Sequence, residues 1–151
     1  MALPITCPTA DPTATPAAVV AIWAMRPGPW DEAGAGAREE SNLPASSFSE
    51  DFLKKLVSVT AAALGKPEDR MHVVVHPGLP MIIKGSCAPC AILSVSAIGA
   101  TDSAEKNKDH SAKIFSFLTS ELNLTEDRIG IMFNALQPHQ VGKKGTVMSF
   151  L

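Results

Sequence analysis

Apolar and polar residues follow two different patterns along the chain, and the pattern changes near residue 41. Residues 1–40 are rich in Pro, Ala, Thr and Gly and show neither a sustained two-residue period nor a 3.6-residue period. Such a segment buries too little apolar surface to offset the entropy that is lost on ordering. The pattern therefore predicts a disordered segment at residues 1–40 and a folded domain at residues 41–151.

The first part of the domain predicts a helix followed by a strand. The helix has an apolar stripe at helical spacing, made of Phe52, Leu53, Leu56, Thr60 and Leu64. Ser47–Glu50 is a candidate capping box at its start, and Gly65 and Pro67 are stop signals at its end. After the triplet Glu68-Asp69-Arg70, residues 71–76 (MHVVVH) have the composition of a strand.

The second part of the domain repeats this order. Residues 91–98 (AILSVSAI) predict a buried strand, Asp102–Glu105 is a second capping box, and Asn123 is a candidate helix end. The predicted buried face of this helix consists of Ala104, Ser111, Ile114, Phe115, Leu118 and Leu122. Residues 129–136 predict a strand, and residues 145–151 predict a last short strand.

The two parts form an internal repeat, since the Glu-Asp-Arg triplets at 68–70 and 126–128 lie 58 residues apart. The repeat predicts an α+β fold with a tandem β-α-β arrangement, in which two helices accompany a four-stranded sheet. The same offset places the first strand at residues 34–40 (GAGAREE). Glycine, alanine and charged residues are poor strand formers, so this strand is predicted to be missing or degraded.

Composition excludes several functional classes. The net charge is −2 and the pI is about 6.1, which gives no reason to expect nucleic-acid binding. The apolar run at residues 17–25 is far shorter than the ~20 residues of a membrane span, and no positive charge precedes it as in a signal peptide. Three cysteines do not make a disulfide framework. We expect a cytoplasmic protein without a membrane partner, with non-classical secretion as the alternative.

Short segments from position 42 onward carry a resemblance to a known family. They are Asn42–Ala45 (NLPA), Leu64–Arg70 (LGKPEDR), Pro77-Gly78, Pro89-Cys90, Ser96–Gly99 (SAIG), His110–Ala112 (HSA), Asp127–Ile129 (DRI) and Val141–Met148 (VGKKGTVM). No single segment would suffice. Taken in this order and spacing, they resemble the macrophage migration inhibitory factor superfamily, and within it the D-dopachrome decarboxylase (tautomerase) branch.

The resemblance implies a homotrimer with active sites at the subunit boundaries, no cofactor and no metal. It implies a small-molecule substrate, D-dopachrome, which loses its carboxylate and tautomerises to 5,6-dihydroxyindole. The family's catalytic base is an exposed N-terminal proline. A terminal amine has a reference pKa of about 8, which burial and nearby cations lower, so the free base exists at neutral pH. A cell-surface receptor is a further candidate partner.

The resemblance also implies which residues form the site. Lys66 and Arg70 correspond to the cations that bind the substrate, and Ile98 corresponds to a residue of the pocket wall. The catalytic proline falls on Ala35, so no catalytic residue is assigned and activity is expected to be impaired. Met132 is a further departure, because close relatives carry a polar pocket residue there.

Two other interpretations stay open. The first is a non-catalytic, cytokine-like interaction protein. The second is thiol redox chemistry by Cys87 and Cys90, which have the motif spacing but precede a strand rather than a helix. A metal site at His72 and His76 is not expected, because four residues of a strand span roughly 13 Å. His110, inside the second helix, is predicted to be structural.

Overall fold

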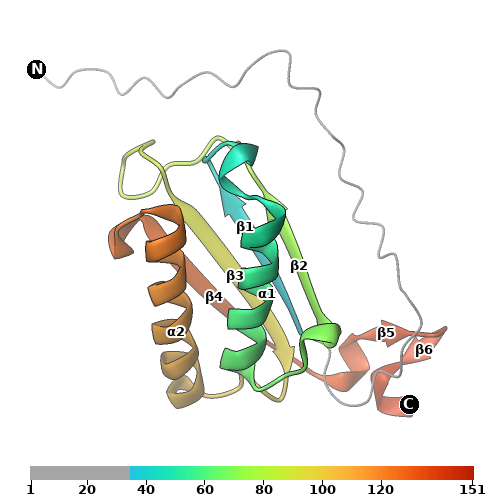
Figure 1. The fold of residues 1–151 in the computed structure, drawn as a ribbon. Helices are drawn as coiled ribbons and strands as arrows, with labels where there is room; N and C mark the ends of the chain where they lie inside the picture. The colour runs from blue at the N-terminus through green and yellow to red at the C-terminus, as the bar shows by residue number, and fades with distance from the viewer. Residues whose placement is uncertain (1–34) are drawn as a thin grey trace, which may run out of the picture.

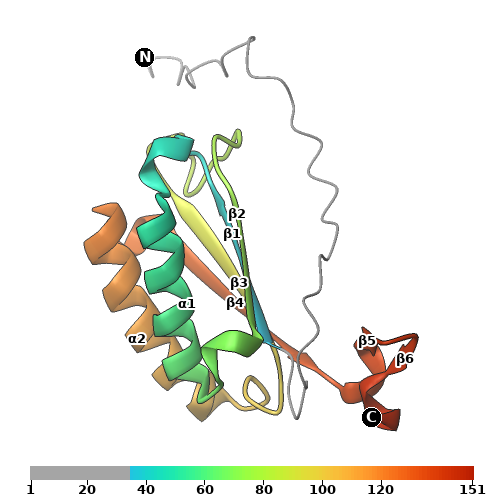
Figure 2. The ribbon, with the colours of Figure 1, turned by 45° about the vertical axis from the view of Figure 1, so that its right-hand side comes forward.

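The structure, a computed structural model, describes residues 35–151, so the expectation of disorder for residues 1–34 lies outside the described residues. Two helices cover one face of a four-stranded sheet, and a small hairpin lies beyond one end of it (Figures 1 and 2). The strands and α-helices are β1 (Ala35–Ser41), α1 (Glu50–Leu64), β2 (Met71–His76), β3 (Ala91–Ile98), α2 (Ala104–Leu122), β4 (Ile129–Leu136), β5 (Gly142–Lys143) and β6 (Thr146–Val147). Short 3₁₀ helices span Ala45–Ser47, Glu68–Arg70, Glu126–Arg128, Pro138–Gln140 and Met148–Phe150.

The sheet has the strand order β2-β1-β3-β4. β1 runs parallel to β2 and β3 runs parallel to β4, while β1 and β3 pair antiparallel at the centre. Each parallel pair is connected through one helix, so the chain consists of two β-α-β units that run in opposite directions. This arrangement confirms the predicted α+β fold with its tandem repeat.

The core lies between the sheet and the helices. Leu56 on α1, Leu93 and Val95 on β3, and Ile114 and Leu118 on α2 have no exposed surface. Full burial of such a side chain stabilises the fold by about 1.5–3 kcal/mol. The helical stripes identified in the sequence therefore face β3, the most deeply buried strand.

Both helices are capped by the chain itself. The side chains of Ser49 and Ser103 each accept a hydrogen bond from the backbone N–H three residues further on, at 3.2 and 3.3 Å. These caps lie two residues and one residue later than the predicted capping boxes. Gly65 (φ 66°) and Asn123 (φ 52°) end the helices in the left-handed conformation, as predicted.

The first strand is present, and the expectation that it is missing or degraded is wrong for Ala35–Ser41. The repeat had placed it within one residue of its observed position, but composition argued against it. Its backbone pairs with β2 on one side and with β3 on the other. Hydrogen bonding on both sides involves backbone groups alone, so small side chains do not prevent it. Residues 35–40 therefore belong to the described sheet.

The remaining elements follow the sequence closely, with two corrections. The bounds of β2, β3 and β4 agree with the predicted strands. The last predicted strand, residues 145–151, is wrong in extent, because only Thr146–Val147 pairs and residues 148–150 form a 3₁₀ turn. Ala104 is exposed on the first turn of α2 rather than buried. None of the described helices is long and apolar enough to cross a membrane.

Candidate functional site

The residues expected to form the site lie at one end of the sheet. Ala35 opens β1 and is in register with Met71, the first residue of β2, and with Ala97 near the end of β3. Arg70 directly precedes Met71, and Ile98 directly follows Ala97. Strand register thus places Ala35, Arg70 and Ile98 at the same end of the sheet, although they are up to 63 residues apart in the sequence.

The two candidate cations belong to the connection between α1 and β2. Lys66 follows the left-handed Gly65, and its backbone N–H donates to the carbonyl of Ala61 at 2.9 Å. The Arg70 backbone N–H donates to Pro67 at 3.1 Å within the next 3₁₀ turn. Both side chains are half-buried. The connection is therefore fixed to the end of α1 and presents two positive charges four residues apart.

The position of the expected base carries no titratable group. Ala35 is buried, and its nitrogen is part of a peptide bond that continues into the preceding residues of the chain. A peptide nitrogen does not accept a proton near neutral pH. The candidate site therefore has two cations, but an unreactive alanine lies at the position that corresponds to the catalytic proline of the family.

One titratable residue near Ala35 was not assigned a role from the sequence. His72 is in register with Gly36, on the sheet face opposite to the helices. Burial lowers the pKa of His72, so its imidazole is neutral at pH 7. A neutral imidazole can accept a proton, which makes His72 the nearest candidate for a substitute base. The sequence did not place His72 near Ala35, because that placement follows from the pairing of β1 with β2 and the sequence predicted no β1.

Met132 does not belong to this end of the sheet within one chain. It lies in the middle of β4, in register with Ser94, and about half of its side chain (53%) is exposed. Strand register therefore brings Arg70 and Ile98 to the same end of the sheet as Ala35, with Lys66 in the connection that precedes Arg70, and leaves Met132 apart.

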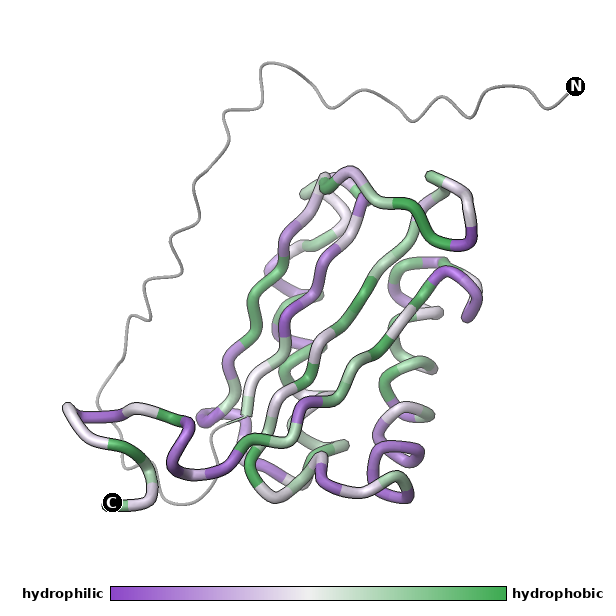
Figure 3. Tube along the Cα trace, turned by 180° about the vertical axis from the view of Figure 1, so that it is seen from behind, coloured by the Kyte–Doolittle hydropathy of each residue, from purple (hydrophilic) through white to green (hydrophobic). Residues whose placement is uncertain are grey.

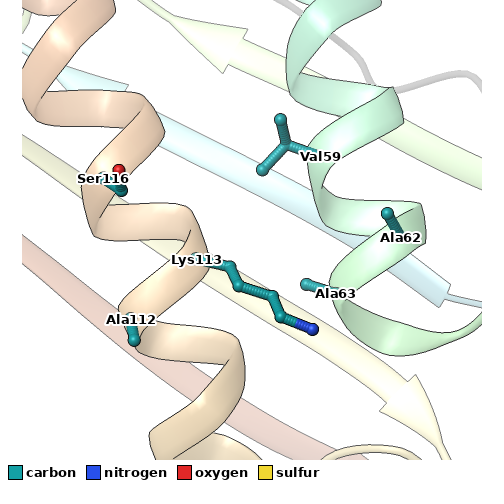
Figure 4. A pocket seen from close by; sticks show the side chains of 6 residues that line it. All are labelled: Val59, Ala62, Ala63, Ala112, Lys113 and Ser116. Carbon is teal, nitrogen blue, oxygen red and sulfur yellow. The ribbon is translucent and has the colours of Figure 1, made fainter.

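Two hollows in the described part of the protein lie along the helices. One is a groove between α1 and α2 that Lys113 partly crosses (Figure 4). It is lined by Val59, Ala62, Ala63, Ala112, Lys113 and Ser116. The other follows the outer side of α2 towards Asp127. Neither is lined by Lys66, Arg70 or Ile98, and these three residues are half-buried.

Arg128, the counterpart of Arg70 in the second repeat, has a structural role that the sequence did not reveal. Its guanidinium donates to four backbone carbonyls of the loop before β3, at 2.6–3.1 Å. These carbonyls belong to Ile83, Ser86, Ala88 and Pro89. The spacing of the two Glu-Asp-Arg triplets indicated that Arg70 and Arg128 are equivalent in position. It did not indicate that Arg128 binds loop carbonyls while Arg70 lies at the candidate site.

The remaining candidates are structural in the described residues. Cys90 is a fully buried free thiol, so it is not bonded to Cys87, and both lie at the opposite end of β3 from Ile98. His110 is buried, with its Nε2 2.7 Å from a backbone carbonyl, as predicted for a structural histidine. Within residues 35–151, no cluster of three or more His, Cys, Asp or Glu side chains could hold a metal ion.

Comparisons with known proteins agree with this arrangement. The family described as "Macrophage migration inhibitory factor (MIF)" matches residues 38–149. D-dopachrome decarboxylases of Xenopus tropicalis and Bos taurus are 51% and 52% identical over 112 residues, which is 74% of this chain and 95% of each relative. The solved structure of the macrophage migration inhibitory factor from Trichinella spiralis superposes with a TM-score of 0.69 at 27% identity, over 74% of this chain and 98% of that one. The family match begins inside β1, three residues after Ala35.

Proposed function

Because the chain belongs to the macrophage migration inhibitory factor family, we propose that it is a D-dopachrome decarboxylase (tautomerase)-like protein that binds a small D-dopachrome-like carboxylate but has impaired catalysis. The identity of about 50% to several D-dopachrome decarboxylases over 95% of their length supports the substrate class. The proposed loss of catalysis rests on one observation. Ala35 lies at the position of the expected base, and its nitrogen belongs to a peptide bond.

The proposed roles follow from the chemistry of each side chain. Arg70 offers a planar guanidinium that can hold a carboxylate through two hydrogen bonds, and Lys66 adds a second positive charge. Ile98 supplies an apolar wall and backbone groups at the end of β3. These residues hold and orient the substrate, but they do not remove a proton. General-base catalysis is typically worth about 10²–10⁴-fold, and this contribution is the one that is absent.

We further propose that the site is completed by a neighbouring subunit in a homotrimer. Lys66, Arg70 and Ile98 are only half-buried, and they line neither of the two hollows along the helices. Ligand sites usually bury most of the ligand surface, and a second protein surface over half-buried residues supplies that burial. A cell-surface receptor and a cytoplasmic location with non-classical secretion stay predictions.

A second candidate function is a non-catalytic, cytokine-like interaction protein. The same observation favours it, because replacement of the base by Ala35 removes proton transfer while the fold is retained. Substrate binding distinguishes the two candidates. A D-dopachrome-like carboxylate should bind in a Lys66- and Arg70-dependent manner only if the site still holds ligand.

The test compares the full chain with a repaired protein in which proline followed by an apolar strand replaces residues 1–41. We expect the repaired protein to convert D-dopachrome about 10²–10⁴-fold faster than the full chain. Lys66→Ala in the repaired protein is the control that links the activity to this site. Equal rates for the two proteins would contradict the proposal, and His72→Asn would then be the next variant to assay.

A further inference from the structure

A carboxyl group is buried in the centre of the sheet without a hydrogen-bond partner. Glu39 on β1 has no exposed surface, and neither of its carboxyl oxygens makes a hydrogen bond. It is in register with Val75 on β2 and Leu93 on β3, and it faces the helices. Buried polar groups are nearly always hydrogen-bonded, and a buried charge without a partner is costly. Glu39 therefore weakens the strand that carries it.

The surroundings of Glu39 offer little compensation. The buried residues of α1 include one polar side chain, Thr60, whose hydroxyl also has no partner. Those of α2 include one titratable group, His110, whose Nε2 is engaged with a backbone carbonyl. The inward-facing neighbours on β2 and β3 are apolar. Arg38 and Glu40 pair with each other at 3.5 Å on the other face of β1. Burial accordingly raises the pKa of Glu39 to about 7.

The strands on either side of β1 are much more apolar than β1 itself, as the colouring of the sheet in Figure 3 shows. Residues 35–41 (AGAREES) contribute two alanines, one glutamate and one serine to the helix-facing side. β2 and β3 both pair with this strand along its length, and backbone pairing of this kind can be made by another extended segment once β1 is released. The slot is therefore better suited to an apolar strand than to the strand that occupies it.

We propose that the slot between β2 and β3 is a strand-binding site, in which an extended segment of a partner protein with an apolar residue at the position of Glu39 replaces residues 35–41. The partner segment pairs in parallel with β2 and antiparallel with β3, as β1 does. Its inward apolar side chain then fills the space of the Glu39 carboxyl.

The strength of this preference depends on pH. Burial raises the pKa of Glu39 from its ordinary value of 4.5 to about 7. Since each unit is a factor of ten, release of β1 is favoured about 300-fold above pH 7 relative to acid, and about 10-fold at pH 5.5. Release should therefore increase about 30-fold between pH 5.5 and pH 8. The tether of β1 opposes exchange, because it acts as an effective concentration in the millimolar range.

The experiment uses the full chain and two fluorescent seven-residue peptides with blocked ends. The first is AGARLES and the second, its matched control, is AGAREES, the natural sequence of β1. AGARLES should bind about 30-fold more tightly at pH 8 than at pH 5.5, and about 100-fold or more tightly than AGAREES at pH 8. On binding, residues 35–41 of the protein should lose hydrogen-exchange protection.

The protein variant Glu39→Leu tests the same site by changing the protein's own strand instead of the peptide. Its own strand no longer carries the buried carboxyl, so it should bind AGARLES at least 100-fold more weakly than the natural chain does at pH 8. The proposal is overturned by absence of AGARLES binding at millimolar concentration, equal binding of both peptides, or unchanged binding by Glu39→Leu. Binding without loss of protection at residues 35–41 also overturns it.

Discussion

The two β-α-β units share their order and spacing, yet their first strands differ completely in composition. β3 (AILSVSAI) is apolar, whereas β1 (AGAREES) contains glycine, alanine and three charged residues. Both nevertheless lie at the centre of the sheet and bury every second side chain against the helices. β3 stabilises the core through its side chains, while β1 is held mainly by the backbone hydrogen bonds that its two neighbours provide.

The same two units use their equivalent arginines differently. Arg128 binds four carbonyls of a loop and fastens that loop to the start of β4. Arg70 occupies the corresponding place before β2, at the opposite end of the sheet, because the two units run in opposite directions. One copy of the repeated triplet is thus structural, and the other is located at the candidate site. Repetition in sequence predicted the position of both residues but not their roles.

Replacement of the buried carboxyl should have the largest effect on stability. Glu39→Leu removes a buried carboxyl whose pKa is raised from 4.5 to about 7, equivalent to about 3 kcal/mol at pH 8, and buries an apolar side chain in its place. We expect the free energy of unfolding to rise by about 3–6 kcal/mol in urea denaturation at pH 8. Arg38→Leu on the exposed face of β1 is the control, with an expected change of about 0.5 kcal/mol or less. A gain below about 1 kcal/mol for Glu39→Leu would show that β1 tolerates the carboxyl.

The two arginines provide the next comparison. Arg128→Ala should lower the free energy of unfolding by about 2–4 kcal/mol, because four charge-assisted hydrogen bonds to the loop are lost. Arg70→Ala should cost at least about 1 kcal/mol less. Arg128→Lys should not restore stability, since one ammonium cannot reach the four carbonyls that the planar guanidinium bridges. Chemical denaturation of the three variants measures the difference, and equal losses for Arg70→Ala and Arg128→Ala would remove the distinction between the two units.

Stability should also depend on pH through Glu39. In the unfolded chain this carboxyl ionises near pH 4.5, whereas in the folded protein it stays protonated up to about pH 7. Its contribution is therefore complete below pH 4.5 and is lost as the pH rises through 7. Between pH 5 and pH 8 the loss should be about 2–3 kcal/mol.

The control for this pH dependence is Glu39→Gln, which keeps the shape but does not titrate. The lowered pKa of His72 acts in the opposite direction, since its neutral form is favoured on folding and stability falls as that histidine is protonated. This contribution is common to both proteins and cancels in the difference between them. Parallel stability curves for the two proteins between pH 5 and pH 8 would be inconsistent with a buried, unpaired Glu39.

Sequence patterns predicted most of the fold, because most helices and strands consist of residues that favour the structure they adopt. β2, β3 and β4 are apolar or β-branched, and the two helices have clear buried stripes, so local sequence and final structure agree. β1 was predicted wrongly because its formation depends on β2 and β3 rather than on its own residues. The positions of Lys66, Arg70 and Ile98 followed from the family resemblance, and the strand register brings them to one end of the sheet. The proximity of His72 to Ala35 required that register and was not available from the sequence.

The smallest predicted effect concerns a feature in which the two units are alike. Ser49 and Ser103 cap α1 and α2 with the same hydrogen bond, at 3.2 and 3.3 Å. Replacement of a capping serine by alanine usually costs about 1 kcal/mol, because one backbone N–H at the helix start loses its partner. We expect Ser49→Ala and Ser103→Ala each to lower the free energy of unfolding by about 1 kcal/mol, with a difference of about 0.5 kcal/mol or less between them. Ser47→Ala is the control, since Ser47 precedes the helix in a 3₁₀ turn and caps nothing there. A loss for Ser47→Ala as large as that for Ser49→Ala would favour the capping box suggested by the sequence and would place the start of α1 two residues earlier in solution.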